Sequence, residues 1–190
     1  MTVSADEALD LFERSGGMLS GHFLLTSGLH SDRYVQKARV LEDPQAAMAL
    51  AREIASWYEA IEVVVAPAVG AIALGFAVAL AAGARSVFAE RADGKLELRR
   101  GFEIAPKERT LVVEDVVTTG GSANEVWELV AARGGERLGV AALIDRSSGP
   151  LAFPLRAILR VEASSWSPDE CPLCAKGLAL DSPGSRRLGG

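Results

Sequence analysis

Two adjacent carboxylates stand between an apolar run and a turn of small residues near the middle of the chain. The apolar run covers residues 111–113, the acids are Glu114 and Asp115, and the turn ends at Ser122. A continuous apolar run is typical of a buried parallel strand, and the helical spacing of apolar residues over 122–132 predicts a helix. The segment therefore predicts a strand, a loop and a helix in succession.

The loop at 118–122 has the composition of a phosphate site. Its backbone N–H groups and hydroxyls can surround one point, at which the following helix presents the positive end of its dipole. Carboxylates repel phosphate, so we assign Glu114 and Asp115 to the vicinal hydroxyls of a sugar beside it. Loop and acids together predict a site for a ribose 5-phosphate.

An ordinary strand-to-helix turn is the alternative, with Ser122 as the N-cap and the glycines serving backbone geometry alone. Two acids at the carboxyl end of an apolar strand are costly unless they bind something, which favours the binding site. The sequence contains neither G-x-x-x-x-G-K-[ST] nor G-x-G-x-x-G. Nothing therefore supports a Walker-type nucleotide hydrolase or a dinucleotide fold.

Length and composition predict one globular domain. The chain has 190 residues, of which 49% are hydrophobic, and this is enough for a substantial core. The apolar run at 71–82 is too short to cross a bilayer, and residues 1–4 lack the basic start of a secretory signal, so we expect a cytoplasmic protein without a membrane segment. The net charge of −5 argues against nucleic-acid binding.

Apolar strands that alternate with helices from residue 62 onward predict an α/β fold with a mostly parallel sheet. The expected strands are 63–66, 86–89, 111–114, 139–145 and 156–161, and the expected helices are 72–81 and 122–133. Before them we expect a helix to about residue 15, a hairpin from 23–26 and 33–36, and a helix from Pro44 to about Glu59.

This pattern predicts a single domain, 1–190, with four parts. An N-terminal helix and hood hairpin occupy 1–42, an α/β core occupies 62–163, and a tail occupies 164–190. Within the core, residues 90–110 are charged and contain glycine, so a mobile hairpin or flap fits this segment better than buried core structure does. The tail has little periodicity and is expected to wrap the surface or a partner subunit.

The string from Leu111 to Ser122 resembles the phosphoribosyl-diphosphate signature of the type I phosphoribosyltransferases. Segments 21–32, 90–102 and 145–146 narrow the resemblance to the orotate phosphoribosyltransferase family. The resemblance implies that family's fold, a central mostly parallel sheet flanked by helices, with a small hood hairpin and a flexible flap.

The activity implied by this resemblance is transfer of the phosphoribosyl group from 5-phosphoribosyl 1-diphosphate to orotate. The products are orotidine 5′-phosphate and pyrophosphate, in de novo pyrimidine (UMP) biosynthesis. The resemblance also implies Mg²⁺ as the cofactor and a homodimer as the assembly. Magnesium should bridge substrate oxygens, so we assign no residue of this chain as a direct metal ligand.

The same resemblance assigns roles residue by residue. It implies that Lys95 and Asp115 are catalytic, and that orotate is bound by Thr26, Thr118 and Arg146. It implies that phosphoribosyl diphosphate is bound by Arg91, Glu114, Asp115, Val116, Val117, Thr118, Thr119, Gly120, Gly121 and Ser122.

The sequence departs from the family at two positions, because Gly70 and Thr26 stand where many relatives carry lysine. Lys37 is a candidate to replace the lysine missing at Thr26. For the pyrophosphate loop around Gly70, we expect the flap to supply the missing positive charge. The cations of the flap are Arg91, Lys95, Arg99 and Arg100. A solvated charge run is the plain alternative for these cations, and an ion pair with the neighbouring Asp145 is the plain alternative for Arg146.

Both histidines and both cysteines are left outside the catalytic set. His22 and His30 are more typical of local structure than of bases here. Cys171 and Cys174 have the spacing of a metal knuckle, but one pair supplies only two of the four ligands of a tetrahedral zinc. A zinc site would need a second pair, either from a symmetry-related subunit or from the histidines.

Two other functions compete with orotate transfer. A purine-base phosphoribosyltransferase would need no cation for a base carboxylate, and Arg146 argues against it. A non-catalytic regulator that senses phosphoribosyl diphosphate would need a basic surface or an added DNA-binding domain, and neither is visible in the sequence.

Overall fold

The chain forms two compact units in the computed structural model, which describes residues 5–25, 27–161 and 165–183. The core unit contains residues 1–9 and 41–161, and the hairpin unit contains residues 10–40 and 162–190. Two of the three boundaries between the units fall within helices, α1 (Ala5–Arg14) and α2 (Lys37–Leu41), and the third follows Val161. Among the described residues, no helix is both long and apolar enough to cross a membrane.

A six-stranded sheet in the order β5-β4-β3-β6-β7-β8 is the centre of the core unit. Its strands are β3 (Val63–Pro67), β4 (Arg85–Ala92), β5 (Lys95–Leu98), β6 (Arg109–Val117), β7 (Glu136–Asp145) and β8 (Leu155–Arg160). Neighbouring strands are parallel except for β5, which pairs antiparallel with β4. The predicted α/β fold with a mostly parallel sheet is confirmed.

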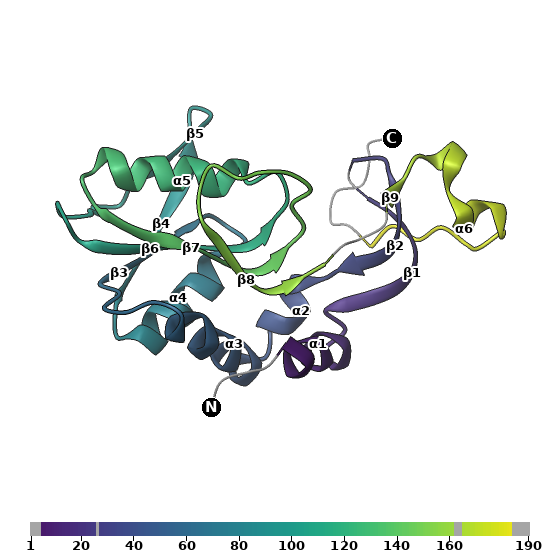
Figure 1. The fold of residues 1–190 in the computed structure, drawn as a ribbon, viewed down its shortest axis with the longest axis horizontal. Helices are drawn as coiled ribbons and strands as arrows, with labels where there is room; N and C mark the ends of the chain where they lie inside the picture. Colours follow the sequence, from purple (N-terminus) through teal and green to yellow (C-terminus); the bar gives the residue numbers. More distant parts are fainter. Residues whose placement is uncertain (1–4, 26, 162–164, 184–190) are drawn as a thin grey trace. The chain divides into compact units, whose positions relative to one another are not determined.

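Helices cover both faces of this sheet. Figure 1 shows α5 (Gly121–Ala132) on one face, with α3 (Pro44–Ser56) and α4 (Ile72–Ala82) on the other. Asp43 caps α3, because its carboxylate accepts a hydrogen bond from the Gln45 N–H at 2.9 Å. Both faces are covered, so the strands must be apolar on both sides, which explains the continuous apolar runs in the sequence.

Segment 90–110 contains a hairpin whose outer strand, β5, belongs to the sheet. Leu96 and Leu98 are buried in the hydrophobic core together with Ile104. The prediction of a hairpin in this segment is confirmed, but the expectation that it is not core is wrong for these three residues. Alternation explains the error: every second residue of β5 is apolar and faces inward, while Lys95 and Glu97 are exposed.

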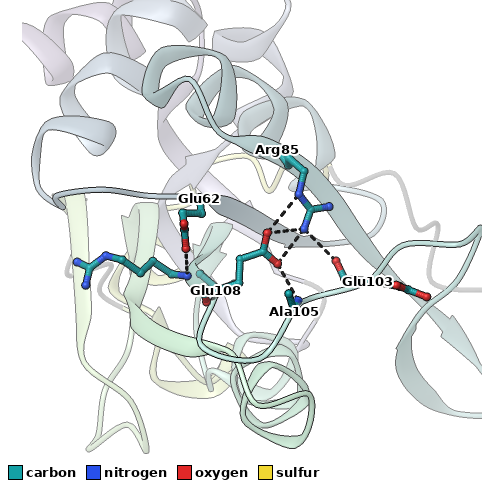
Figure 2. A network of polar contacts seen from close by, with 7 residues as sticks. Glu62, Arg85, Glu103, Ala105 and Glu108 are labelled. Carbon is teal, nitrogen blue, oxygen red and sulfur yellow. Dashed lines mark hydrogen bonds and ion pairs between the residues drawn. The ribbon is translucent and has the colours of Figure 1, made fainter.

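A polar network joins the amino-terminal ends of three core strands, β3, β4 and β6 (Figure 2). Arg85 of β4 donates three hydrogen bonds to the carboxylate of Glu108, at 2.7, 2.8 and 3.3 Å, and a fourth to the Glu103 carbonyl. The Ala105 N–H donates to the same carboxylate, and the Arg109 N–H donates to Glu62. These contacts tie the starts of the three strands to one another.

The hairpin unit contains a three-stranded antiparallel sheet in the order β1-β2-β9. Its strands are β1 (Met18–Leu24), β2 (His30–Val35) and β9 (Ser165–Trp166), and two short helical turns follow, η1 (Pro168–Glu170) and α6 (Pro172–Ala175). The predicted hairpin is confirmed, with strands longer than expected. β9 shows that part of the tail belongs to this sheet, a non-local pairing that periodicity alone does not reveal.

Candidate active site

The unit formed by β6, its following loop and α5 appears where the sequence predicted it, with one difference at the helix start. The N-cap is Gly120, one position before Gly121, and not Ser122. Gly120 has φ of 77°, and a Cβ there would lie 2.9 Å from Leu151 Cδ2. Glycine is therefore required by both conformation and space, and no side chain at the N-cap competes with an anion for the first N–H groups of α5.

A hollow of about 80 Å³ opens at this loop. On the same measure a single water molecule needs only about 10–15 Å³, so the hollow has room for a larger group. Its wall includes three hydroxyl side chains and the start of α5, which suits an anion at the positive end of the helix dipole. The lining residues are Glu114, Val116, Val117, Thr118, Thr119, Gly120, Gly121, Ser122 and Ala123.

The two predicted acids lie at the end of β6 and are both buried. Glu114 lines the hollow, whereas Asp115, its neighbour, is not among the lining residues. Each carboxylate accepts a hydrogen bond from the next backbone N–H: Glu114 from Asp115 at 3.0 Å, and Asp115 from Val116 at 2.6 Å. These bonds hold the two carboxylates in place beside the loop.

Arg146 is brought to the same edge of the sheet by the pairing of β7 with β6. Its backbone N–H donates to the Val117 carbonyl at 2.8 Å, so Arg146 follows β7 at the point where the loop leaves β6. Asp145 accepts hydrogen bonds from the backbone and hydroxyl of Ser147 and forms an ion pair with Arg160 at 3.6 Å. Arg146 and Thr118 are thus close along the backbone, as a shared base site requires.

Arg91 is bound to the helix that follows the loop. Its guanidinium forms an ion pair with Glu125 of α5 at 3.0 Å, and the Leu96 N–H donates to the same carboxylate. The hydrogen bond from Arg91 lowers the pKa of Glu125, against the smaller opposing effect of burial. Arg91 thus links the 90–110 hairpin to α5.

The other flap cations differ in their surroundings. Lys95 is exposed at the start of β5, opposite Ala92. Arg99 and Arg100 both form ion pairs with Glu90, at 3.9 and 3.0 Å. For these two arginines the ion pairs give a local structural reason for their presence, which sequence reasoning did not identify.

The second predicted loop joins β3 to α4. Gly70 and Val69 are exposed there, and the Ala68 N–H donates to the Ala89 carbonyl of β4 at 2.7 Å. β3 and β6 are adjacent in the sheet, so their loops leave the same edge. Thr26, predicted to contact orotate, lies outside the described residues.

A hollow at a sheet edge and a helix start, with acids beside it, is the arrangement expected of the phosphoribosyltransferase class, and the comparison of sequences assigns the chain to it. The sequence profile of the phosphoribosyl transferase domain matches residues 38–153. The chain belongs to the orotate phosphoribosyltransferase family: it is 47% identical over 190 residues to the orotate phosphoribosyltransferase of Desulforamulus reducens, covering 98% of this chain and all of that protein.

Solved structures agree. Orotate phosphoribosyltransferase from Aeropyrum pernix has the same fold, with a TM-score of 0.68 at 23% identity, covering 80% of this chain and 93% of that one. The enzyme from Mycobacterium tuberculosis in complex with inorganic phosphate has a TM-score of 0.64 at 27% identity, covering 82% of this chain and 95% of that one. The resemblance predicted from the sequence is confirmed.

Proposed function

We propose that this chain transfers the phosphoribosyl group of 5-phosphoribosyl 1-diphosphate to orotate, giving orotidine 5′-phosphate and pyrophosphate in pyrimidine biosynthesis. The observation that supports this most is the hollow between Glu114 and the start of α5, in a chain 47% identical to an orotate phosphoribosyltransferase. The hollow takes the 5-phosphate, for which the loop offers N–H groups and hydroxyls.

The ribose lies next to the acids in this proposal. Glu114, at the edge of the hollow, accepts hydrogen bonds from the vicinal hydroxyls. Asp115 lies next to it in the sequence and has the catalytic role that the family resemblance implies. As the bond from C1 to the diphosphate breaks, the ribose gains oxocarbenium character, and nearby carboxylates stabilise that developing positive charge. Their burial strengthens the effect, because the local dielectric is low.

Orotate is bound through its carboxylate by Arg146 and through its ring by Thr118. The backbone bond from Arg146 to Val117 supports this pairing, since it keeps the two residues at one edge of the sheet. An arginine recognises a carboxylate with two parallel hydrogen bonds, which also orients the planar ring. A contribution from Thr26 stays a prediction.

The leaving diphosphate needs positive charge. We assign Arg91 and Lys95 to it, Lys95 as the catalytic cation, supported by its exposure at the tip of the hairpin. The two carboxylates at the end of β6 fit Mg²⁺, because they offer the oxygen donors that this cation prefers. When bound, magnesium would supply positive charge to the leaving diphosphate. Glu114 and Asp115 would hold it through substrate oxygens and water.

A homodimer and a cytoplasmic location complete the proposal. Both follow from membership of the family and stay predictions. The resemblance implies a dimer in which the flap of each subunit contributes residues to the active site of the other.

A base panel tests the proposal. Orotate, uracil, adenine, hypoxanthine and xanthine are each supplied with phosphoribosyl diphosphate and magnesium, and pyrophosphate release is measured. We expect pyrophosphate release only when orotate is the base supplied. Release with a purine in place of orotate would assign a purine-base phosphoribosyltransferase, and tight binding of phosphoribosyl diphosphate without release with any base would assign a ligand-sensing protein.

A further inference from the structure

All the histidines and cysteines of the chain meet at one point in the hairpin unit. The sequence contains two of each. They are His22, His30, Cys171 and Cys174, and their four ligand atoms lie within 4.8 Å of one another. None of them has a role in the proposed transfer reaction. Such convergence of residues far apart in the sequence asks for a physical reason.

The distances match those of a tetrahedral zinc site. Zn–N bonds of about 2.05 Å and Zn–S bonds of about 2.3 Å place tetrahedral ligands about 3.3 Å apart for two nitrogens and about 3.6 Å apart for nitrogen and sulfur. Here His22 Nε2 lies 3.0 Å from His30 Nδ1. The nitrogen–sulfur distances are 3.5, 3.7 and 3.3 Å.

Strand pairing places the two histidines on one face of the hairpin. Leu24 is opposite His30, so His22, two residues earlier on β1, lies diagonally across from it. An irregularity in the β1–β2 register falls between Ser20 and Phe23, next to His22. Such a bulge bends a strand and re-aims its side chains.

The two cysteines come from a knuckle in the tail. Cys171 precedes α6 and Cys174 lies within it, and the chain then turns at Gly177, whose φ is 68°. The tail also pairs with β1 next to the site, because the Asp181 N–H donates to the His22 carbonyl at 2.8 Å. The backbone therefore holds both pairs of ligands together.

A hydrogen bond on the far side of the His22 ring fixes its tautomer. His22 Nδ1 lies 2.9 Å from the Leu178 carbonyl, which only accepts, so Nδ1 carries the proton. Nε2 then presents its lone pair to the cluster. A ligating histidine that donates its other N–H to a carbonyl is the usual arrangement at protein metal sites.

Burial favours a structural site. His22, His30 and Cys171 are 4%, 5% and 3% exposed, and only Cys174 faces solvent. We propose that these four residues bind one zinc ion as a closed Cys₂His₂ site that fastens the C-terminal tail to the hairpin. Four protein ligands leave no open position for substrate, so the ion stabilises structure and takes no part in the transfer.

Metal analysis of the full-length chain, purified without a histidine tag, tests this proposal. We expect about one zinc per chain, as a four-ligand site requires. Replacing the zinc with Co²⁺ should give the intense visible bands of a tetrahedral ion and thiolate-to-cobalt charge transfer in the near ultraviolet. Thiol labelling should be slow until a chelator is added, and the chelator should lower the midpoint of thermal unfolding.

Variants identify the ligands. Cys171→Ser combined with Cys174→Ser should lose at least nine-tenths of the zinc, and His30→Gln should lose the tetrahedral cobalt spectrum. Lys176→Gln, an exposed neighbour, is the matched control and should keep both. The wild-type measurements decide the matter even where a variant fails to fold. Three results would each overturn the proposal. They are wild-type protein that holds no zinc after dialysis against a zinc solution, a cobalt spectrum without thiolate bands, and a Cys171–Cys174 disulfide.

Discussion

Glu114 and Asp115 have the wrong charge for a phosphate site and the right chemistry for the sugar beside it. The structure keeps both acids buried at the end of β6, where backbone N–H groups hold their carboxylates. Burying two adjacent acids costs stability unless a ligand or hydrogen bonds compensate. Backbone hydrogen bonds supply part of that compensation, and the proposed ribose contact would supply more.

Replacing both acids by their amides should impair the reaction and leave the fold intact. Glu114→Gln with Asp115→Asn keeps the volume but removes the charged acceptors, each worth on the order of 1.5–3 kcal/mol. We expect kcat/KM for phosphoribosyl diphosphate to fall at least about tenfold to a hundredfold. Steady-state kinetics measure this, with Glu128→Gln on the surface of α5 as the control. Wild-type kinetics in the double variant would remove the ribose assignment.

Arg146 should act on one substrate alone. Arg146→Ala removes the proposed partner of the orotate carboxylate, and an arginine–carboxylate pair shielded from water contributes on the order of 1.5–3 kcal/mol. We expect the KM for orotate to rise about tenfold to a hundredfold, with a much smaller change for phosphoribosyl diphosphate. Arg160→Ala, an exposed arginine paired with Asp145, is the control. Equal effects on both substrates would argue against a base-site role.

At the scale of elements, the phosphate loop depends on one backbone conformation. Gly120→Ala places a Cβ at positive φ and 2.9 Å from Leu151 Cδ2. We expect a loss of roughly 1–3 kcal/mol in the free energy of unfolding, together with weaker binding of phosphoribosyl diphosphate. Gly94→Ala is the matched control, because φ is 85° there but no atom lies within 4 Å. Denaturant titration of both should show the larger loss at Gly120.

The network at the starts of β3, β4 and β6 should make the free energy of unfolding depend on pH. Burial alone would raise the pKa of Glu108, but hydrogen bonds from Arg85 and Ala105 and the charge of Arg85 lower it below its usual 4.5. A lowered folded-state pKa means that the stabilisation is present above the unfolded value and is lost as the pH falls through the folded value.

Glu108→Gln tests this network. At neutral pH we expect a loss of about 1 kcal/mol, since Arg85 is half exposed and solvent screens the pair. The difference from wild type should shrink as the pH is lowered below about 4.5, because the wild-type carboxylate becomes protonated. Glu97→Gln, an exposed acid of β5, should show no such trend. A constant difference across the pH range would contradict the assignment.

At the scale of the whole molecule, we expect the flap to act across a homodimer. Lys95 lies exposed next to the turn of a charged hairpin, opposite Ala92. A Lys95→Ala chain and an Asp115→Asn chain should each be weak alone. Mixed dimers would combine one intact flap with one intact phosphate loop and regain activity at one of two sites. Confirmed subunit exchange without a gain in activity would show that the flap works within its own chain.

The sequence by itself determined the elements whose signals are local. Apolar runs and helical spacing were enough to predict β6, its loop and α5. The spacing of apolar residues along the chain indicates which face of a strand or helix is buried. The acids at 114 and 115 were recognisable for the same reason, since charge at the end of an apolar strand is conspicuous in any context. Only their different access to the hollow was not predicted.

Tertiary structure decided everything that depends on residues distant in sequence. Arg91 meets Glu125, 34 positions away, and β5 joins the core through Leu96 and Leu98, which a charged segment had hidden. His22 and Cys171 are 149 positions apart and yet in contact. Periodicity carries no information on which elements pair, whereas burial and strand register do, and they turned two unassigned residue pairs into one candidate metal site.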